Sequence, residues 1–197
     1  MIEVEKKFYL NPEQEAKLVE GAEFMGEYTN HDVYYDLDDF SLTKRCHWLR
    51  KRNNNFELKK RAHDLKPAGF SGVYMYDEIE DEQRIAETLQ IEYSGNLETD
   101  LKENGYHSFS EYTVTRRSYK RDLFRIDFDS CDFGYAVIEI ERLVEDDSQK
   151  QQALEEINTF AEEIGIDTTP ATGKLIEYLK RFSPDHYKTL QDAGVVE

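Results

Sequence analysis

The sequence predicts an α+β fold in which an antiparallel β-sheet closes, or nearly closes, into a barrel with a charged interior and helices packed outside. Two observations lead to this prediction. Charged side chains recur at every second position of several strand-like segments, while the alternate positions are apolar. Between these segments lie amphipathic stretches with helical periodicity, which need an apolar surface to cover.

The length and composition are those of one folded domain. The chain has 197 residues, of which 39% are hydrophobic and 13% aromatic, which is enough for one sizeable core. Such an aromatic content is not typical of a disordered chain. The sequence contains no internal repeat and no linker rich in proline, glycine or serine. Residues 1–197 are therefore expected to form a single domain.

Five segments carry the signals of helices, and a sixth carries weaker ones. Asn11 and Pro12 supply a cap and a first helical residue, and Gln14 completes a capping box, which predicts a helix to about Gly21. Apolar residues at helical spacing predict the other helices, one of which ends at Gly165. These helices are expected at residues 80–92, 154–164, 175–182 and 183–190, with a short one near 96–104.

Six segments show the two-residue alternation of strands, with charged and apolar residues on opposite faces. They are residues 2–8, 46–52, the return after a turn at Asn53–Asn55, 112–119, 124–129 and 136–142. The acidic residues on the charged faces are Glu3, Glu5, Glu57, Asp127, Asp129, Glu139 and Glu141. The basic residues on these faces are Lys7, Arg50, Arg52, Lys59, Arg61, Arg116 and Arg125.

Two interpretations of these charged faces are open. One side of an antiparallel sheet commonly faces water, so each charged face could simply be solvated. Several segments with the same pattern, dense in arginine and carboxylate, favour instead a sheet that curls with its charged faces inward. Mixed signs of charge lower the cost of such an interior. Arginine and lysine suit phosphate oxygens and clustered carboxylates suit Mg²⁺, so a curled sheet indicates a site for a polyphosphate and a metal ion.

Composition also restricts the partners and the compartment. The net charge of −17 would repel a long nucleic acid, so none is expected as a partner. No apolar run approaches the length of a membrane span, and no membrane partner is expected. Cys46 and Cys131 are too few and too far apart for a disulfide framework, which favours reduced thiols and a cytoplasmic protein. Because the motifs begin at Glu3, no signal peptide is expected. The acidic surface favours a monomer.

Longer motifs point to a family. Glu3, Glu5 and Lys7 stand in the order E-x-E-x-K, and here the chain is similar to the CYTH superfamily of triphosphate tunnel enzymes. Residues 31–52 and 56–59 resemble the second, third and fourth strands of that family. Residues 126–141 and 173–187 resemble the animal-type thiamine-triphosphatases in particular. The resemblance covers residues 2 to about 192 and implies the same kind of barrel.

The resemblance implies roles for individual charged residues. The implied ligands of one or two Mg²⁺ ions are Glu3, Glu5, Asp127, Glu139 and Glu141. The implied ligands of the triphosphate are Lys7, Arg50, Arg52, Arg116 and Lys174. Lys59 is the position implied to orient or deprotonate the attacking water, and a further phosphate contact is its alternative role. The sequence departs from the family's pattern at 53–55 and at 172–173, directly before Lys174.

Two aromatic residues are candidates for binding the organic part of the substrate. Trp48 shares a strand face with Arg50 and Arg52, where an indole could stack on a cationic ring, although a position in the core is the alternative. Tyr76 matches a tyrosine of the thiamine-triphosphatases that faces the pyrimidine ring. This match crosses a loop at about 62–73.

The reaction implied by the resemblance is the Mg²⁺-dependent hydrolysis of thiamine triphosphate to thiamine diphosphate and phosphate. A first alternative is an inorganic tripolyphosphatase or a broader nucleoside triphosphatase of the same fold. A second alternative is a polyphosphate binder without catalytic activity. Because binding alone would need mainly the basic residues, the presence of both acidic and basic sets favours an enzyme.

Overall fold

The computed structural model describes residues 2–61, 73–74, 76–169 and 171–196. The chain divides into two compact units, and each has a hydrophobic core of its own. Unit 1 comprises Met1–Thr29, Gly69–Met75 and Val114–Glu177, and unit 2 comprises Asn30–Ala68, Tyr76–Thr113 and Tyr178–Glu197. The long strands β2 and β7 and the helix α5 each contribute residues to both units. The expectation of one domain for residues 1–197 stays a prediction.

Strands supply the framework of both units. They are β1 (Ile2–Phe8), β2 (Glu23–Asp36), β3 (His47–Arg52), β4 (Asn55–Arg61), β5 (Val73–Tyr74), β6 (Tyr76–Ile79), β7 (His107–Arg121), β8 (Phe124–Cys131) and β9 (Tyr135–Val144). In unit 1 the hydrogen-bonded order is β5-β1-β9-β8-β7, and in unit 2 it is β2-β3-β4-β6. The strand pairs of known register are antiparallel.

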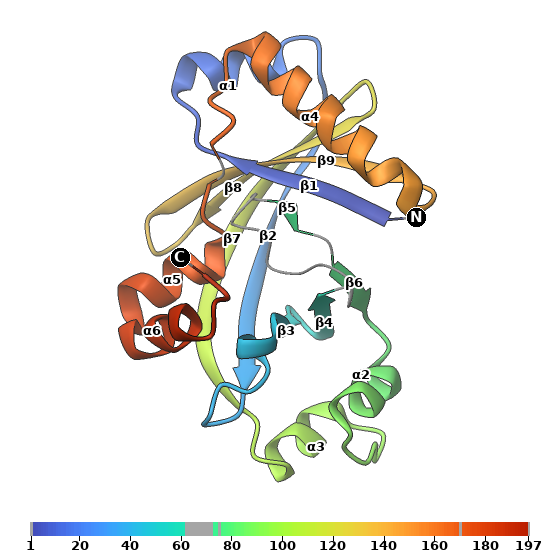
Figure 1. Ribbon diagram of the computed structural model, residues 1–197, viewed down its shortest axis with the longest axis vertical. Coiled ribbons are helices and arrows are strands. Elements are labelled where there is room, and N and C mark those ends of the chain that lie inside the picture. The colour runs from blue at the N-terminus through green and yellow to red at the C-terminus, as the bar shows by residue number, and fades with distance from the viewer. Residues whose placement is uncertain (1, 62–72, 75, 170, 197) are drawn as a thin grey trace. The chain divides into compact units, whose positions relative to one another are not determined.

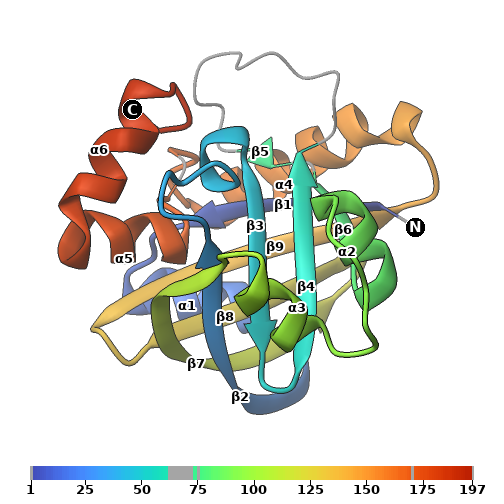
Figure 2. The same cartoon turned by 90° about the horizontal axis from the view of Figure 1, so that it is seen from below.

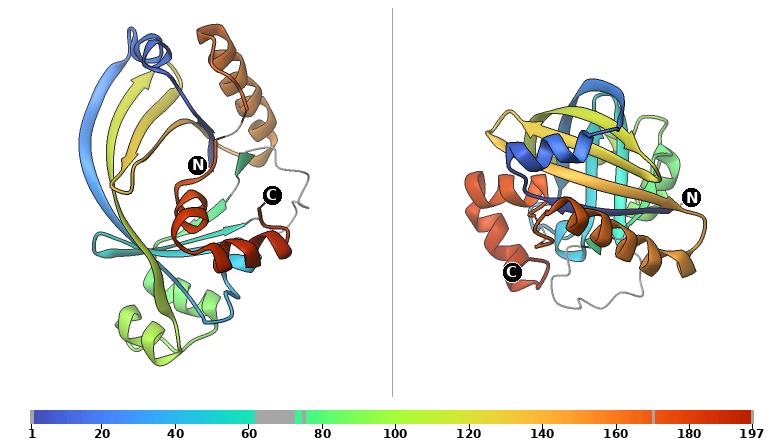
Figure 3. Two further views of the ribbon diagram at one scale, coloured as in Figure 1. Left: turned by 90° about the vertical axis from the view of Figure 1, so that its left-hand side faces the viewer. Right: turned by 90° about the horizontal axis from the view of Figure 1, so that it is seen from above.

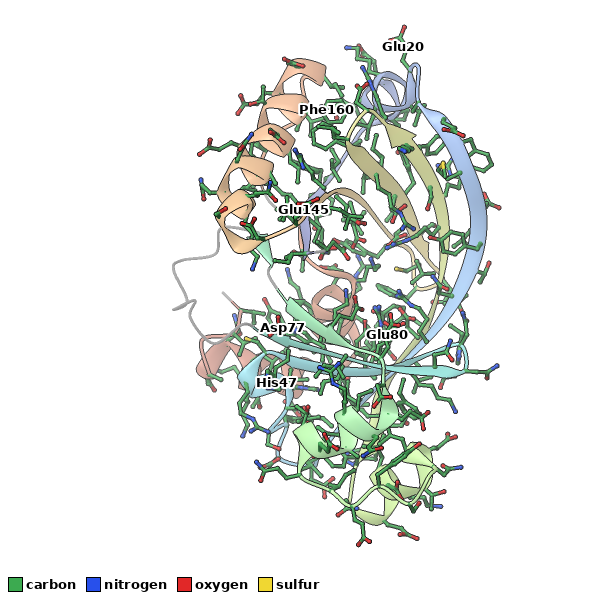
Figure 4. The ribbon with its side chains drawn as sticks, turned by 90° about the vertical axis from the view of Figure 1, so that its right-hand side faces the viewer. Glu20, His47, Asp77, Glu80, Glu145 and Phe160 are labelled. Atoms are coloured by element: carbon green, nitrogen blue, oxygen red, sulfur yellow. The ribbon has the colours of Figure 1, made fainter. Side chains whose placement is uncertain are left out.

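Helices cover one face of the sheet in unit 1. The helix α1 (Pro12–Val19) and the long helix α4 (Lys150–Ile164) pack on the apolar face of β1, β8 and β9 (Figures 1 and 3). Phe160 of α4 points toward the strands (Figure 4) and stacks on Phe124 with 4.6 Å between ring centroids. Ile126 and Ile140 are fully buried beneath these helices. The opposite face of the same strands carries the charged residues.

Unit 2 repeats this arrangement with different helices. The helices α2 (Glu82–Leu89) and α3 (Leu97–Glu103) lie against β3 and β4 (Figure 2), and their contact buries Leu49, Leu58 and Ile85. Each helix begins with an acceptor side chain as its cap, Asp81 for α2 and Asn96 for α3. As in unit 1, the helices cover the apolar face and leave the charged face on the other side.

The loop between β2 and β3 depends on one carboxylate. Asp36 is fully buried, and its oxygens accept hydrogen bonds from the amides of Leu37, Leu42 and Thr43 and from the Thr43 hydroxyl. This loop contains the short 3-10 helix η1 (Thr43–Arg45). Asp36 thus supplies the acceptors that secondary structure provides elsewhere.

The C-terminal helix docks onto this loop. After α5 (Lys174–Phe182), the helix α6 (Pro184–Asp192) places His186 against Phe40, with 3.7 Å between the stacked rings. The His186 Nε2 atom lies 2.8 Å from the Thr43 hydroxyl oxygen. Since that hydroxyl donates to Asp36, Nε2 carries a proton and donates to it. Burial lowers the pKa of His186 to about 4.

The elements confirm most of the expected segments. The predicted capping box at Asn11 is present, and Gly165 ends α4 with a left-handed backbone, φ +79°. Asn53, in the turn between β3 and β4, also has a left-handed backbone, φ +56°. The expected strand at 46–52 begins one residue later, because Cys46 caps η1 in the left-handed conformation. None of the helices in the described part of the chain is both long and apolar enough to cross a membrane.

Candidate active site

The charged face of unit 1 is built by antiparallel register. Lys7 of β1 pairs with Glu139 of β9, and Glu139 pairs in turn with Asp127 of β8. Arg116 of β7 pairs with Asp129 of β8. Because side chains alternate along a strand, these pairs bring residues from four strands onto one surface. The register thus places these charged residues of unit 1 on one face of the sheet.

Arg116 lies at the centre of this surface. Its Nε and Nη2 atoms donate to the two oxygens of Asp129, each at 2.6 Å. Its Nη1 donates to Asp127 at 2.6 Å, and Nη2 donates also to Glu139 at 2.7 Å. Burial lowers the pKa of the Arg116 guanidinium, but Glu139, Asp129 and Asp127 outweigh it and raise that pKa above its ordinary value. Arg116 is therefore held by carboxylates on three sides.

Two lysines complete the pairing around Glu139. The Lys174 ammonium donates to Asp129 at 2.5 Å and to Glu139 at 2.7 Å, and it is buried. Lys7 donates to Glu5 at 2.5 Å and lies 3.3 Å from Glu139. Burial alone would raise the pKa of Glu139, but Lys174, Lys7 and Arg116 hold it well below its ordinary value. Glu139 thus stays ionised in a buried position.

Glu141 has a different environment two residues further along β9. It lies directly opposite Glu5 in the register of β1 and β9. Burial raises the pKa of Glu141, Arg125 opposes this, and the nearby charges of Asp127 and Glu5 raise it further, for a net increase. Like charges in directly opposed positions destabilise a sheet. Burial and the nearby carboxylates therefore disfavour the ionised form of Glu141, in contrast to Glu139.

The five expected metal ligands all belong to unit 1, with Glu3 half-buried on the same strand face as Glu5. Within the described residues, however, no three or more carboxylate, histidine or cysteine side chains are arranged to hold a metal ion. The oxygens of Asp127 and Glu139 are instead bound to Arg116, and Glu139 also binds Lys174.

The charged face of unit 2 contains the two expected arginines of β3. Arg52 forms a two-pronged pair with the fully buried Asp32, with both hydrogen bonds at 2.7 Å. Arg50 donates to Glu57 of β4 and reaches the Tyr34 hydroxyl at 3.5 Å. Burial lowers the pKa of both guanidinium groups, but their anionic and hydrogen-bonding partners outweigh it and raise both pKa values.

The remaining candidates of unit 2 lie nearer its more exposed edge. Lys59 is directly opposite Trp48 in the β3–β4 register, and its ammonium lies 3.4 Å from Glu78 of β6. The Lys59 and Glu78 side chains retain 24% and 34% of their exposure, against 10% for Arg50. Trp48 is half-buried on the strand face of Arg50. Tyr76 begins β6, and its side chain is outside the described part of the chain.

Three further residues belong to one or the other of these charged faces, although the sequence analysis assigned them no role in the site. Asp129 stood on the expected charged face, but not among the ligands, and it binds both Arg116 and Lys174. Asp32 binds Arg52, and Tyr34 contacts Arg50. The alternation of Asp32, Tyr34 and Asp36 in residues 32–36 was the available signal, because it places a carboxylate and a hydroxyl on one face of β2.

Comparison with known proteins identifies the family. Residues 1–172 match the CYTH domain. The chain belongs to the CYTH domain family. This CYTH protein is 33% identical to the thiamine-triphosphatase of Homo sapiens, over 98% of this chain and 91% of the human protein. It is 32% identical to the thiamine-triphosphatase of Macaca fascicularis over the same shares of both chains.

Solved structures share the fold of this CYTH protein. The PH1819 protein from Pyrococcus horikoshii OT3 has a TM-score of 0.64 and 22% identity, over 91% of this chain and 98% of that one. HpAC1 from Hippeastrum, described with a dominant triphosphatase activity, has a TM-score of 0.62 and 14% identity, over 92% and 96% of the two chains. The expected α+β class with an antiparallel sheet is thereby confirmed. Closure of the sheet around a tunnel stays a prediction.

Proposed function

We propose that this CYTH protein hydrolyses thiamine triphosphate to thiamine diphosphate and phosphate, with Mg²⁺ as cofactor. Membership of the CYTH family and the thiamine-triphosphatase relatives support a triphosphatase activity. The observation that carries the proposal is that 33% identity extends over 98% of the chain, so the matched region includes the strands of both charged faces.

The basic residues of the two faces are proposed to bind phosphate oxygens. Arg52 uses Nε and Nη2 for Asp32, and within the described residues its Nη1 makes no hydrogen bond. A guanidinium held by one edge can offer the other edge to a phosphate. Phosphate binding is also proposed for Lys7, Arg50, Arg116 and Lys174.

The acidic residues of unit 1 are proposed to hold Mg²⁺. Carboxylate oxygens are the ligands that Mg²⁺ prefers. A divalent cation would offset the negative charges of the directly opposed Glu5 and Glu141. Glu3, Asp127 and Glu139 extend this donor set along the same surface. When bound, Mg²⁺ would supply positive charge to offset the negative charge of the transferring phosphoryl group.

The reaction requires little covalent chemistry from the protein. A water attacks the terminal phosphorus in line with the leaving diphosphate, and positioned cations stabilise the charge of the transition state. Lys59, the least buried of the basic candidates in unit 2, is proposed to orient the attacking water or to contact a phosphate. Trp48, on the strand face of Arg50, is proposed to stack on the thiazolium ring of thiamine.

A tripolyphosphatase or broader nucleoside triphosphatase is the second candidate function. Paired charges of the kind found on each face suit the phosphates of any triphosphate. Among the described residues, only the aromatic Trp48 is assigned to the organic part. The test is Mg²⁺-dependent phosphate release from thiamine triphosphate, tripolyphosphate and ATP side by side. We expect the largest kcat/KM for thiamine triphosphate. A larger value for tripolyphosphate would reject thiamine triphosphate as the preferred substrate.

The same assay addresses a polyphosphate binder without catalytic activity. Such a protein would bind tripolyphosphate tightly, as measured by calorimetry, without releasing phosphate from any of the three substrates. The acidic residues of unit 1 argue against this candidate, because they would weaken the binding of a bare anion.

A further inference from the structure

A closed ring of hydrogen bonds lies immediately before Lys174 in unit 1. The Tyr135 hydroxyl of β9 contacts the Thr172 carbonyl oxygen and lies 3.1 Å from the Tyr9 hydroxyl. The Thr172 amide nitrogen lies 3.2 Å from the Tyr9 hydroxyl oxygen. Three groups from three distant parts of the sequence therefore meet at one point.

The protons of this ring can be assigned from the chemistry of its members. A carbonyl oxygen cannot donate, so the Tyr135 hydroxyl donates to Thr172. A hydroxyl has only one proton, so the Tyr9–Tyr135 contact is made by the proton of Tyr9. The Thr172 amide then donates to Tyr9 and closes the ring. Each donor has one acceptor, and removal of either hydroxyl opens the ring.

The tyrosines are themselves fixed in place. Tyr135 is buried, and its ring is nearly parallel to that of Phe133, with 6.1 Å between centroids. The rings of Tyr135 and Tyr9 are nearly perpendicular, with 6.2 Å between their centroids. One residue earlier, the Ala171 amide donates to the Lys7 carbonyl oxygen at 3.1 Å. The segment that leads into α5 is thus attached to both β1 and β9.

The attachment matters because Lys174 lies only two residues beyond Thr172. Gly173 separates Thr172 from Lys174, and no atom outside its immediate neighbours lies within 4 Å of the place where its Cβ would be. The Gly173 carbonyl oxygen accepts a hydrogen bond from the Glu177 amide at 3.0 Å, but glycine has no side chain whose packing could restrain its backbone. The Lys174 ammonium must nevertheless lie 2.5 Å from Asp129 and 2.7 Å from Glu139. The ring at Thr172 restrains the backbone that carries Lys174.

We propose that Tyr135, with Tyr9, is a positioning residue for Lys174. The ring fixes the start of α5 and so holds the Lys174 ammonium among the carboxylates of unit 1. The catalytic part of this inference rests on the proposed function, whereas the positional part does not.

The positional part is tested by chemical labelling of Lys174 in the full chain. Acetic anhydride acetylates accessible amines, and mass spectrometry of peptides gives the rate at Lys174. The Tyr135→Phe variant loses the hydroxyl that closes the ring of hydrogen bonds, but it keeps the aromatic ring that stacks on Phe133. We expect Lys174 to be labelled about 10-fold faster, the factor that loss of one hydrogen bond gives to a local opening. Tyr93→Phe is the matched control. In the described part of the chain the Tyr93 hydroxyl donates to Glu82 of unit 2, so this variant should leave the rate at Lys174 unchanged.

A second variant tests the same hydrogen-bond ring independently, in case Tyr135→Phe does not fold. Tyr9 is half-exposed, so Tyr9→Phe removes the other hydroxyl at a site that tolerates change, and it should also accelerate the labelling. Wild-type labelling rates in a folded Tyr135→Phe or Tyr9→Phe variant would overturn the proposal.

The catalytic part is tested by a double-mutant cycle. Tyr135→Phe should lower kcat/KM for thiamine triphosphate about 10-fold in the wild-type background. In a Lys174→Met background it should have no further effect, since its target is already absent. Equal losses in both backgrounds would mean that Tyr135 acts through another group, and would reject its role in positioning Lys174. If the protein hydrolyses no triphosphate, the proposed function fails while the labelling result still decides the positional part.

Discussion

The two charged faces are built alike but compensated differently. In unit 1 Arg116 binds three carboxylates, and its side chain retains only 13% of its exposure. In unit 2 each guanidinium has one main acidic partner, Arg50 with Glu57 and Arg52 with Asp32. Carboxylates predominate in the first face, whereas acids and bases balance in the second. Under the proposed function, the excess of carboxylates would place the metal ion at unit 1, while basic residues of both units would bind phosphate.

The largest expected effect tests this assignment through activity. Glu5→Gln removes a carboxylate of unit 1, and Arg52→Ala removes a cation of unit 2. Each should lower kcat/KM by at least about two orders of magnitude, in line with loss of a charged contact in the transition state. Steady-state phosphate release measures both. Near-wild-type turnover in the two variants would mean that the site lies elsewhere in the chain.

The free energy of unfolding should distinguish a buried arginine with several carboxylate partners from an exposed arginine at the edge of the face. Arg116→Gln leaves Asp127, Asp129 and Glu139 short of positive charge in a buried place, which should cost about 3–5 kcal/mol in the free energy of unfolding. Arg125→Gln is the matched control, because the Arg125 side chain is 47% exposed and lies 3.1 Å from Asp127. It should cost about 1 kcal/mol or less. Urea denaturation measures both, and equal losses would contradict the central role of Arg116.

Substitution of two glutamates on one face of β9 should change the free energy of unfolding in opposite directions. Glu139→Gln weakens the pairing with Lys174, Lys7 and Arg116, and should cost about 1.5–3 kcal/mol of stability at neutral pH. Glu141→Gln relieves the repulsion with Glu5 and should raise stability by about 0.2–1 kcal/mol. Both values come from urea denaturation without Mg²⁺. A loss in Glu141→Gln comparable to that in Glu139→Gln would show that the two ends of the face are equally compensated.

The smallest expected effect is a loss of stability at low pH, caused by His186 where α6 packs in unit 2. The folded pKa of His186 is about 4, below the ordinary value of 6.5, so the unfolded chain binds more protons between these values. The stability contributed by neutral His186 is fully present above pH 6.5 and is lost as the pH falls toward about 4. His186→Gln cannot titrate and should lose less stability over this window. Thermal melts of both proteins at pH 7, 5.5 and 4 provide the measurement, and parallel losses would exclude His186 as the cause.

Sequence patterns predicted the secondary-structure elements better than they predicted which charged side chains pair with each other. Caps and alternation are local, so the capping box at Asn11 and the charged faces of β1 and β9 followed directly from the sequence. The first half of β2 was not predicted, because Gly26 interrupts its alternation and the neighbouring Phe24 and Met25 remain exposed. Strand register decides which opposite charges meet, and alternation alone does not fix it. The Asp32–Arg52 pair therefore emerged only from the structure.

Asp36 has a consequence for how this chain can vary. One side chain ties together the amides at both ends of the segment from Leu37 to Thr43, so the segment has a fixed number of residues. An insertion there would move some of these amides away from the two Asp36 oxygens. Those amides would then lose the acceptors that the Asp36 carboxylate provides. We therefore expect homologous chains to keep the length of this segment while exposed residues such as Asp38 vary.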